Sequence, residues 1–137
     1  MEWRGCADVA TAHGDKGATV KNQRLAERMG FAWAGLRAAW RTERSLRTQA
    51  WIALAVIPVM AILRPALIWW ALIGITITLV LAAELINTAL EHLVDHLHPE
   101  RHPRIKIVKD CAAAAVLVLS IGAVWVGVLM IWSVMGG

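Results

Sequence analysis

Three long apolar runs dominate the pattern of hydrophobic and polar positions along this chain. They cover residues 50–63, 66–83 and 111–135 and hold 14, 18 and 25 consecutive uncharged residues. An α-helix needs about 20 apolar residues to cross a bilayer. The first run reaches that length if its helix begins near Leu46 and Arg47 extends its charged end to the membrane surface. The pattern therefore predicts an integral membrane protein with three transmembrane helices.

An amphipathic pattern precedes the first apolar run. Its apolar side chains recur at steps of three and four residues, the spacing of one helix face, and they are Leu25, Met29, Ala32, Trp33, Leu36 and Trp40. Arginines occupy much of the remaining surface, namely Arg24, Arg28, Arg37, Arg41 and Arg44. A basic face opposite a Trp/Leu face is typical of a helix lying in the membrane interface. A surface helix of a soluble core is the alternative.

The chain before this helix shows a different composition. Residues 1–23 mix charges with glycines and have no apolar period. We therefore expect a poorly ordered N-terminal tail. The rest, residues 24–137, is expected to form one membrane-embedded domain. The predicted fold class is an all-α integral membrane protein with an amphipathic interfacial helix followed by three transmembrane helices.

Charge and composition predict how the chain is oriented in the membrane. The formal charge is +4, and the chain holds eight Trp but no Tyr, a bias that suits the membrane boundary. Because the basic residues border apolar segments, they favour anionic lipid headgroups over nucleic acid as a partner. Nine Lys and Arg precede the first span, one lies in the first loop, and four lie in residues 84–110. The positive-inside rule then places the N-terminus and the second loop in the cytoplasm.

Candidate chemistry gathers where the second apolar run ends. Glu84, Asn87, Glu91 and Asp95 follow one another at steps of three, four and four residues, so they share one helix face. We call these four residues the acidic face. An acid as close to hydrocarbon as Glu84 suggests a functional site, and burial would make it a better proton acceptor.

A structural role for the acidic face is the alternative. Its carboxylates could pair with basic side chains and simply hold helices together. The candidate partners are Arg37, Arg104 and Lys109.

Two or three carboxylates and an amide on one face suit Mg²⁺, which prefers hard oxygen ligands and keeps waters and phosphates as its other ligands. Lys109 and the arginines of the amphipathic helix could hold phosphate oxygens. The chain has neither a P-loop motif nor a kinase glycine-rich loop. ATP, if it binds, is therefore held by a different design.

Histidines near the acidic face offer a second metal hypothesis. His92 and His96 are four residues apart, with His98 and His102 beyond, and this spacing can bind zinc. The surrounding prolines indicate a polar loop, and a closed Cys/His set is missing from the sequence. A zinc site is therefore the less favoured hypothesis.

Taken together, these motifs resemble the prokaryotic diacylglycerol kinases. The resemblance runs from about Arg24 to the C-terminus, and its most specific block is Glu84–Glu91, read as Glu-Leu-Ile-Asn-Thr-Ala-Leu-Glu. The other matching features are Gly35–Trp40, Glu43, Asp95 and the Lys109-Asp110 pair before an alanine-rich span. The resemblance implies a homotrimer in the bacterial inner membrane, with active sites shared between subunits near the cytoplasmic surface. It also implies transfer of the ATP γ-phosphate to a lipid hydroxyl.

The resemblance also implies residue roles. Glu84 is similar to the general base, Glu43 and Glu91 to the Mg²⁺ ligands, and Asn87 and Asp95 to supporting residues. The implied ATP contacts are Arg24, Phe31, Glu43, Glu91, Glu100, His102, Lys109 and Asp110. The implied lipid contacts are Arg24, Arg28, Trp33, Arg37, Trp40 and Glu84.

Some positions depart from the enterobacterial pattern. Gln49 replaces an acid, and Phe31 and Ala32 replace a Tyr and a Ser. Residues 42–44 and 87–92 resemble the Gram-positive branch, whose members can prefer undecaprenol. Diacylglycerol is the favoured acceptor and undecaprenol the alternative. A small proton-coupled membrane transporter and a structural membrane subunit are the alternatives from other functional classes.

Overall fold

The chain is described by a computed structural model over residues 25–98 and 102–136. Its elements are helices, and they are α2 (Leu25–Thr42), α3 (Arg44–Leu63), α4 (Leu67–Leu97) and α5 (Pro103–Met135). In this described part, α3, α4 and α5 are long and apolar enough to cross a membrane. The prediction of an all-α chain with three apolar spans after an N-terminal helix is confirmed. The predicted tail, residues 1–23, lies outside the described residues.

The chain divides into two units, residues 1–35 and 36–137, and α2 crosses the boundary. In the first unit, the apolar side chains of α2 lie exposed, with Leu25 at 72% and Trp33 at 67%. An interfacial helix presents such an apolar face to lipid. The first unit therefore keeps the amphipathic character that the sequence predicts.

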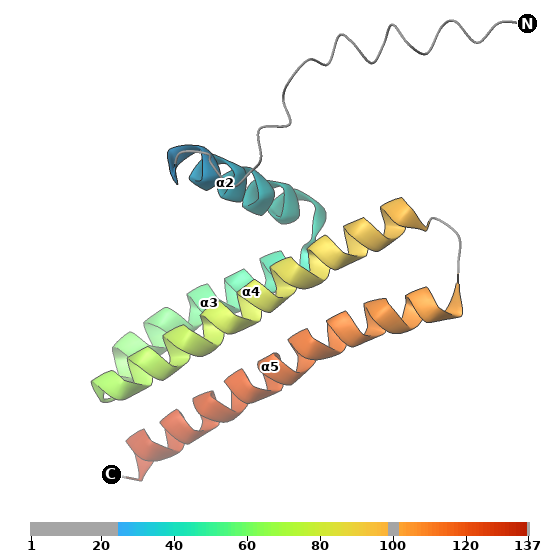
Figure 1. Cartoon of the computed structure of the whole chain (residues 1–137). Helices are drawn as coiled ribbons and strands as arrows, with labels where there is room; N and C mark the ends of the chain where they lie inside the picture. The colour runs from blue at the N-terminus through green and yellow to red at the C-terminus, as the bar shows by residue number, and fades with distance from the viewer. Residues whose placement is uncertain (1–24, 99–101, 137) are drawn as a thin grey trace, which may run out of the picture. The chain divides into compact units, whose positions relative to one another are not determined.

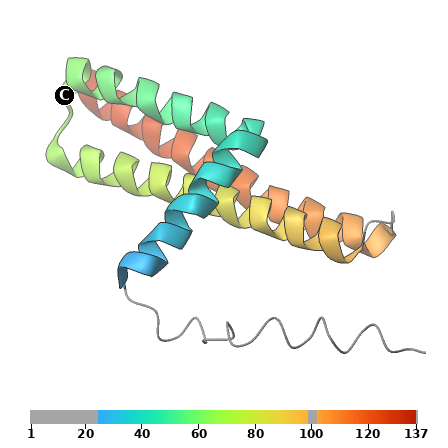
Figure 2. The same ribbon diagram turned by 90° about the horizontal axis from the view of Figure 1, so that it is seen from above.

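In the second unit, α3, α4 and α5 run side by side (Figures 1 and 2). The turn between α3 and α4 is made by Arg64, which adopts a left-handed conformation with φ 48° and donates its N–H to the Met60 carbonyl. This is a common way to end a helix. Pro65 follows, and since it has no N–H it cannot continue α3.

The main apolar core lies at this turn. Met60 of α3, Ile73 of α4 and Met130 of α5 are buried together. Partly buried side chains pack around them, namely Val56, Leu63, Trp69, Ile77 and Val126. We call this cluster the apolar end. Most of the remaining apolar surface of the three spans is exposed in the single chain, as expected for helices covered by lipid or by further copies.

Helices α4 and α5 continue well beyond their apolar runs. Helix α4 extends past residue 83 to Leu97, and α5 begins at Pro103, before the apolar run that starts at Cys111. Residues 84–110 are therefore mostly helical. His92 and His96, which the sequence placed in a polar loop, belong to α4. The helical spacing of the acidic face runs through this segment to Asp95, and the helix continues with it.

Candidate functional site

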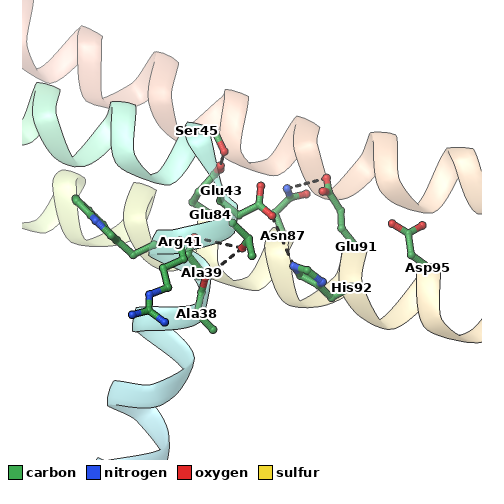
Figure 3. Close-up of polar contacts among 12 residues, drawn as sticks. Ala38, Ala39, Arg41, Glu43, Ser45, Glu84, Asn87, Glu91, His92 and Asp95 are labelled. Carbon is green, nitrogen blue, oxygen red and sulfur yellow. Dashed lines mark hydrogen bonds and ion pairs between the residues drawn. The ribbon is translucent and has the colours of Figure 1, made fainter.

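Glu84 lies on α4 where the apolar run ends, and its side chain is buried at 3% exposure. The Ser45 hydroxyl of α3 donates a hydrogen bond to Glu84 Oε1 (Figure 3). Thr88, one turn further along α4, is also buried. The sequence predicted the position of Glu84 at the edge of the apolar run but did not identify its hydroxyl partner.

Glu43 is the single residue between α2 and α3. Its backbone is extended, with φ −98° and ψ 119°, and this break turns its side chain toward α4. Glu43 Oε1 lies 3.6 Å from His92 Nε2 (Figure 3). The break thus brings the Glu43 carboxylate next to His92 of α4.

Two neighbours stabilise this break. Leu46 is buried at 2% exposure and anchors the first turn of α3. The Arg47 guanidinium donates to the carbonyl oxygens of Trp40 at 2.8 Å and Arg41 at 3.1 Å. Arg47, which we expected to extend toward the membrane surface, caps the last turn of α2, where helix carbonyls lack partners.

Asn87 and Glu91 interact along α4. Asn87 Nδ2 donates to Glu91 Oε1 at 3.0 Å, which fixes the direction of the Glu91 carboxylate. Asn87 Oδ1 is buried without a hydrogen-bond partner in the described chain. A free amide oxygen beside a carboxylate is a donor set that suits Mg²⁺.

The described residues do not form a closed metal site. Within residues 25–98 and 102–136, no three His, Cys, Asp or Glu side chains gather closely enough to hold a metal by themselves. Mg²⁺ commonly takes only one or two carboxylates and fills its other positions with phosphate oxygens and water. The Glu91 carboxylate and the Asn87 amide oxygen lie one turn apart on α4 and are donors of the kind that such an ion takes. Glu43 lies near His92 in the single chain.

Asp95 at the far end of the acidic face makes an ion pair with α5. Lys109 Nζ lies 2.8 Å and 3.0 Å from the two carboxylate oxygens of Asp95. Asp110 accepts from Lys106 at 2.5 Å, one turn away on α5. For Asp95, the structural pairing that we raised as an alternative is present, since it links α4 to α5.

The other predicted contacts are spread over the chain. His102 caps α5, because its Nδ1 accepts from the Arg104 N–H at 3.2 Å. Arg37 and Trp40 belong to the second unit, and both are exposed. Arg28, Phe31 and Trp33 lie in the first unit. Arg24 and Glu100 lie outside the described residues. Their roles stay predictions.

Comparison with known proteins gives one family. Residues 30–131 match the family model described as prokaryotic diacylglycerol kinase. A diacylglycerol kinase of Synechocystis is 43% identical over 71% of this chain and 56% of its own length. One of Escherichia coli K12 is 33% identical over 82% of this chain and 93% of its own length. An undecaprenol kinase of Bacillus subtilis is 37% identical over 73% of this chain and 83% of its own length.

Proposed function

Since the chain belongs to the prokaryotic diacylglycerol kinase family, we propose that it is a membrane lipid kinase that transfers the ATP γ-phosphate to a lipid hydroxyl. Diacylglycerol is the proposed main acceptor, with phosphatidic acid and ADP as products. The observation that carries this proposal is the position of Glu84. It is a buried carboxylate at the edge of an apolar span, beside further acids suited to a phosphate-bound cation.

Glu84 is the proposed general base. The lipid hydroxyl approaches from the bilayer and gives its proton to Glu84 Oε2, the oxygen that Ser45 leaves free. The hydroxyl oxygen bonds to the γ-phosphorus as the bond to the ADP oxygen breaks. A base placed within hydrogen-bond reach of the attacking hydroxyl typically contributes about 10²–10⁴-fold to the rate.

Glu43 and Glu91 are the proposed Mg²⁺ ligands. Asn87 holds Glu91 Oε1, so the second Glu91 oxygen is left to face a cation. The amide oxygen of Asn87 has no other partner in the described chain and is a further donor. Bound Mg²⁺ would neutralise charge on the phosphate oxygens.

Nucleotide and lipid contacts follow from the family resemblance. Arg24, Phe31, Glu100, His102, Lys109 and Asp110 complete the proposed ATP site. In this proposal Lys109 exchanges its Asp95 contact for a phosphate oxygen, and cations bind phosphate through such charge-assisted bonds. The proposed lipid contacts on α2 are Arg28, Trp33, Arg37 and Trp40.

The proposed assembly is a homotrimer in the bacterial inner membrane, with residues 24–137 as the kinase domain and residues 1–23 as a tail. The single chain leaves most apolar side chains of its spans exposed, and neighbouring copies would cover part of that surface. Active sites would be shared between subunits. The N-terminus and the α4–α5 loop would face the cytoplasm, where ATP is available.

Undecaprenol is the second candidate acceptor, because a relative named for that substrate is 37% identical to this chain. Purified protein in detergent should be given labelled ATP with diacylglycerol and undecaprenol in parallel. We expect diacylglycerol to be phosphorylated, giving labelled phosphatidic acid, at a higher rate than undecaprenol. A higher rate on undecaprenol would reverse the assignment, and no lipid phosphorylation would contradict the kinase proposal and favour a transport or scaffold role.

A further inference from the structure

The hydrogen bond between Ser45 and Glu84 joins two helices at the proposed base. Glu84 is 3% exposed, and a buried carboxylate is costly unless hydrogen bonds compensate for lost water. In the described chain the Ser45 hydroxyl provides such a bond to Oε1. Ser45 is not among the proposed Mg²⁺ ligands or nucleotide contacts.

Both residues of this bond belong to helices, which suits it to orienting a side chain. Ser45 is an exposed residue in the first turn of α3, directly beside Leu46, which is buried at 2% exposure. On α4, Glu84 and Thr88 face the same packed region and are both buried. Figure 3 shows the Ser45 side chain directed at Glu84. A group held on a packed helix constrains its partner more tightly than a loop residue does.

The consequence concerns the second carboxylate oxygen. A carboxylate held at one oxygen can no longer turn freely, so its other oxygen points in one direction. Proton transfer depends strongly on such alignment, and an error of about 1 Å can cost about 10²-fold in rate.

We propose that Ser45 is a positioning residue for Glu84, holding Oε1 so that Oε2 is presented to the lipid hydroxyl. This inference rests on the proposed function, because it assumes that Glu84 is the base. It predicts that Ser45 acts on the chemical step and has little influence on ATP binding.

The test compares Ser45→Thr with Ser45→Val. These two side chains have nearly the same shape, but only threonine keeps the hydroxyl. Turnover with saturating lipid should stay within about threefold of the parent for Ser45→Thr and fall about tenfold or more for Ser45→Val, as expected for a lost hydrogen bond to a charged group. The KM for ATP should change less than about twofold in both.

Thr48→Ala is the matched control. Thr48 lies one turn further along α3, is exposed, and bonds the Arg44 carbonyl of its own helix at 3.0 Å. Its removal takes away a hydroxyl without touching Glu84, so turnover should stay at the parent level. A loss as large as that of Ser45→Val would show that any hydroxyl deletion in α3 has this effect, and would overturn the proposal.

A double variant separates positioning from folding. In the Glu84→Gln background, adding Ser45→Val should lower the residual single-turnover rate no further, because the base is already gone. An equal further loss would overturn the proposal, as would normal turnover of Ser45→Val. Loss of helix content in Ser45→Val but not in Ser45→Thr would also overturn it, since the bond would then hold the fold. If both branched residues lower helix content, Ser45→Ala replaces Ser45→Val in these comparisons.

The same set tests the underlying function separately. If Glu84→Gln itself turns over normally, the proposed base is wrong, whatever Ser45 does. If Glu84→Gln is inactive and Ser45→Val is normal, only the role of Ser45 fails.

Discussion

The two ends of the helical hairpin α3–α4 are stabilised in different ways. At the apolar end, Met60 and Ile73 pack with Met130 of α5. At the opposite end, specific polar contacts join Ser45 to Glu84 and Glu43 to His92. Apolar packing is non-directional and tolerates exchange of similar volumes. The polar contacts depend on direction. We therefore expect substitutions at the polar end to lower turnover and substitutions at the apolar end to lower stability.

Glu84→Gln should produce the largest effect on turnover and would sharpen this contrast most. The substitution keeps shape and hydrogen-bonding capacity but removes the proton acceptor, so turnover should fall about 10²–10⁴-fold. The KM for ATP should change little, because other residues are proposed to hold the nucleotide. Steady-state kinetics of lipid phosphorylation measure both, and an unchanged turnover number would remove Glu84 from the catalytic role.

Asn87→Ala should have the next largest effect. Asn87 holds Glu91 Oε1 at 3.0 Å, and loss of a group that orients a metal ligand typically costs about 10–100-fold in affinity or activity. Initial rates against Mg²⁺ concentration should show a higher Mg²⁺ requirement. Thr78→Ala is the control, because that hydroxyl bonds only the Gly74 carbonyl of α4 at 2.8 Å in the described chain. An Asn87→Ala protein with the parent Mg²⁺ requirement would contradict the metal assignment.

His92→Ala should have a small effect. The His92 side chain is 62% exposed and lies 3.6 Å from Glu43, and exposed pairs contribute about 0–1 kcal/mol. We therefore expect the Mg²⁺ requirement to rise at most about fivefold, since Glu43 loses one restraint. His96→Ala, on the next turn, is the comparison variant. A loss as large as that of Glu84→Gln would mean that His92 takes part in the reaction directly.

Met60→Ala should leave turnover unchanged below the unfolding temperature while lowering stability. Met60 is buried at 2% exposure in the apolar end, and truncation of such side chains to alanine costs about 2–5 kcal/mol. Unfolding of the detergent-solubilised protein, followed by helix content, should show the loss. A fall in turnover without a fall in stability would break the contrast between the two ends.

The sequence predicted the spans well because the signal is local. Each apolar run is long, and the steps of the acidic face lie within one helix, so neither depends on knowing the neighbours. The ends of α4 and α5 were less predictable, since polar helical residues past the membrane edge look like loop composition. Residues 92–97 show this error.

Contacts between helices could not be predicted from spacing. Ser45 is a small polar residue in the first turn of a span, with no local feature that marks it as a partner of Glu84. Its role depends on the register between α3 and α4, which the buried Leu46 and the tight turn at Arg64 help to set. Asp95 likewise had several possible basic partners in the sequence, and the packing of α4 on α5 selects Lys109.

The single-residue break at Glu43 makes the junction between α2 and α3 intolerant of length changes. Glu43 and Ser45 are two positions apart, yet they reach His92 and Glu84, which lie about two turns apart on α4. One inserted residue between them would rotate the start of α3 by about 100° and shift it by about 1.5 Å relative to Glu43. An insertion or deletion at this junction should therefore separate the two contacts, whereas a substitution beside Glu43 or Ser45 leaves the spacing between them unchanged.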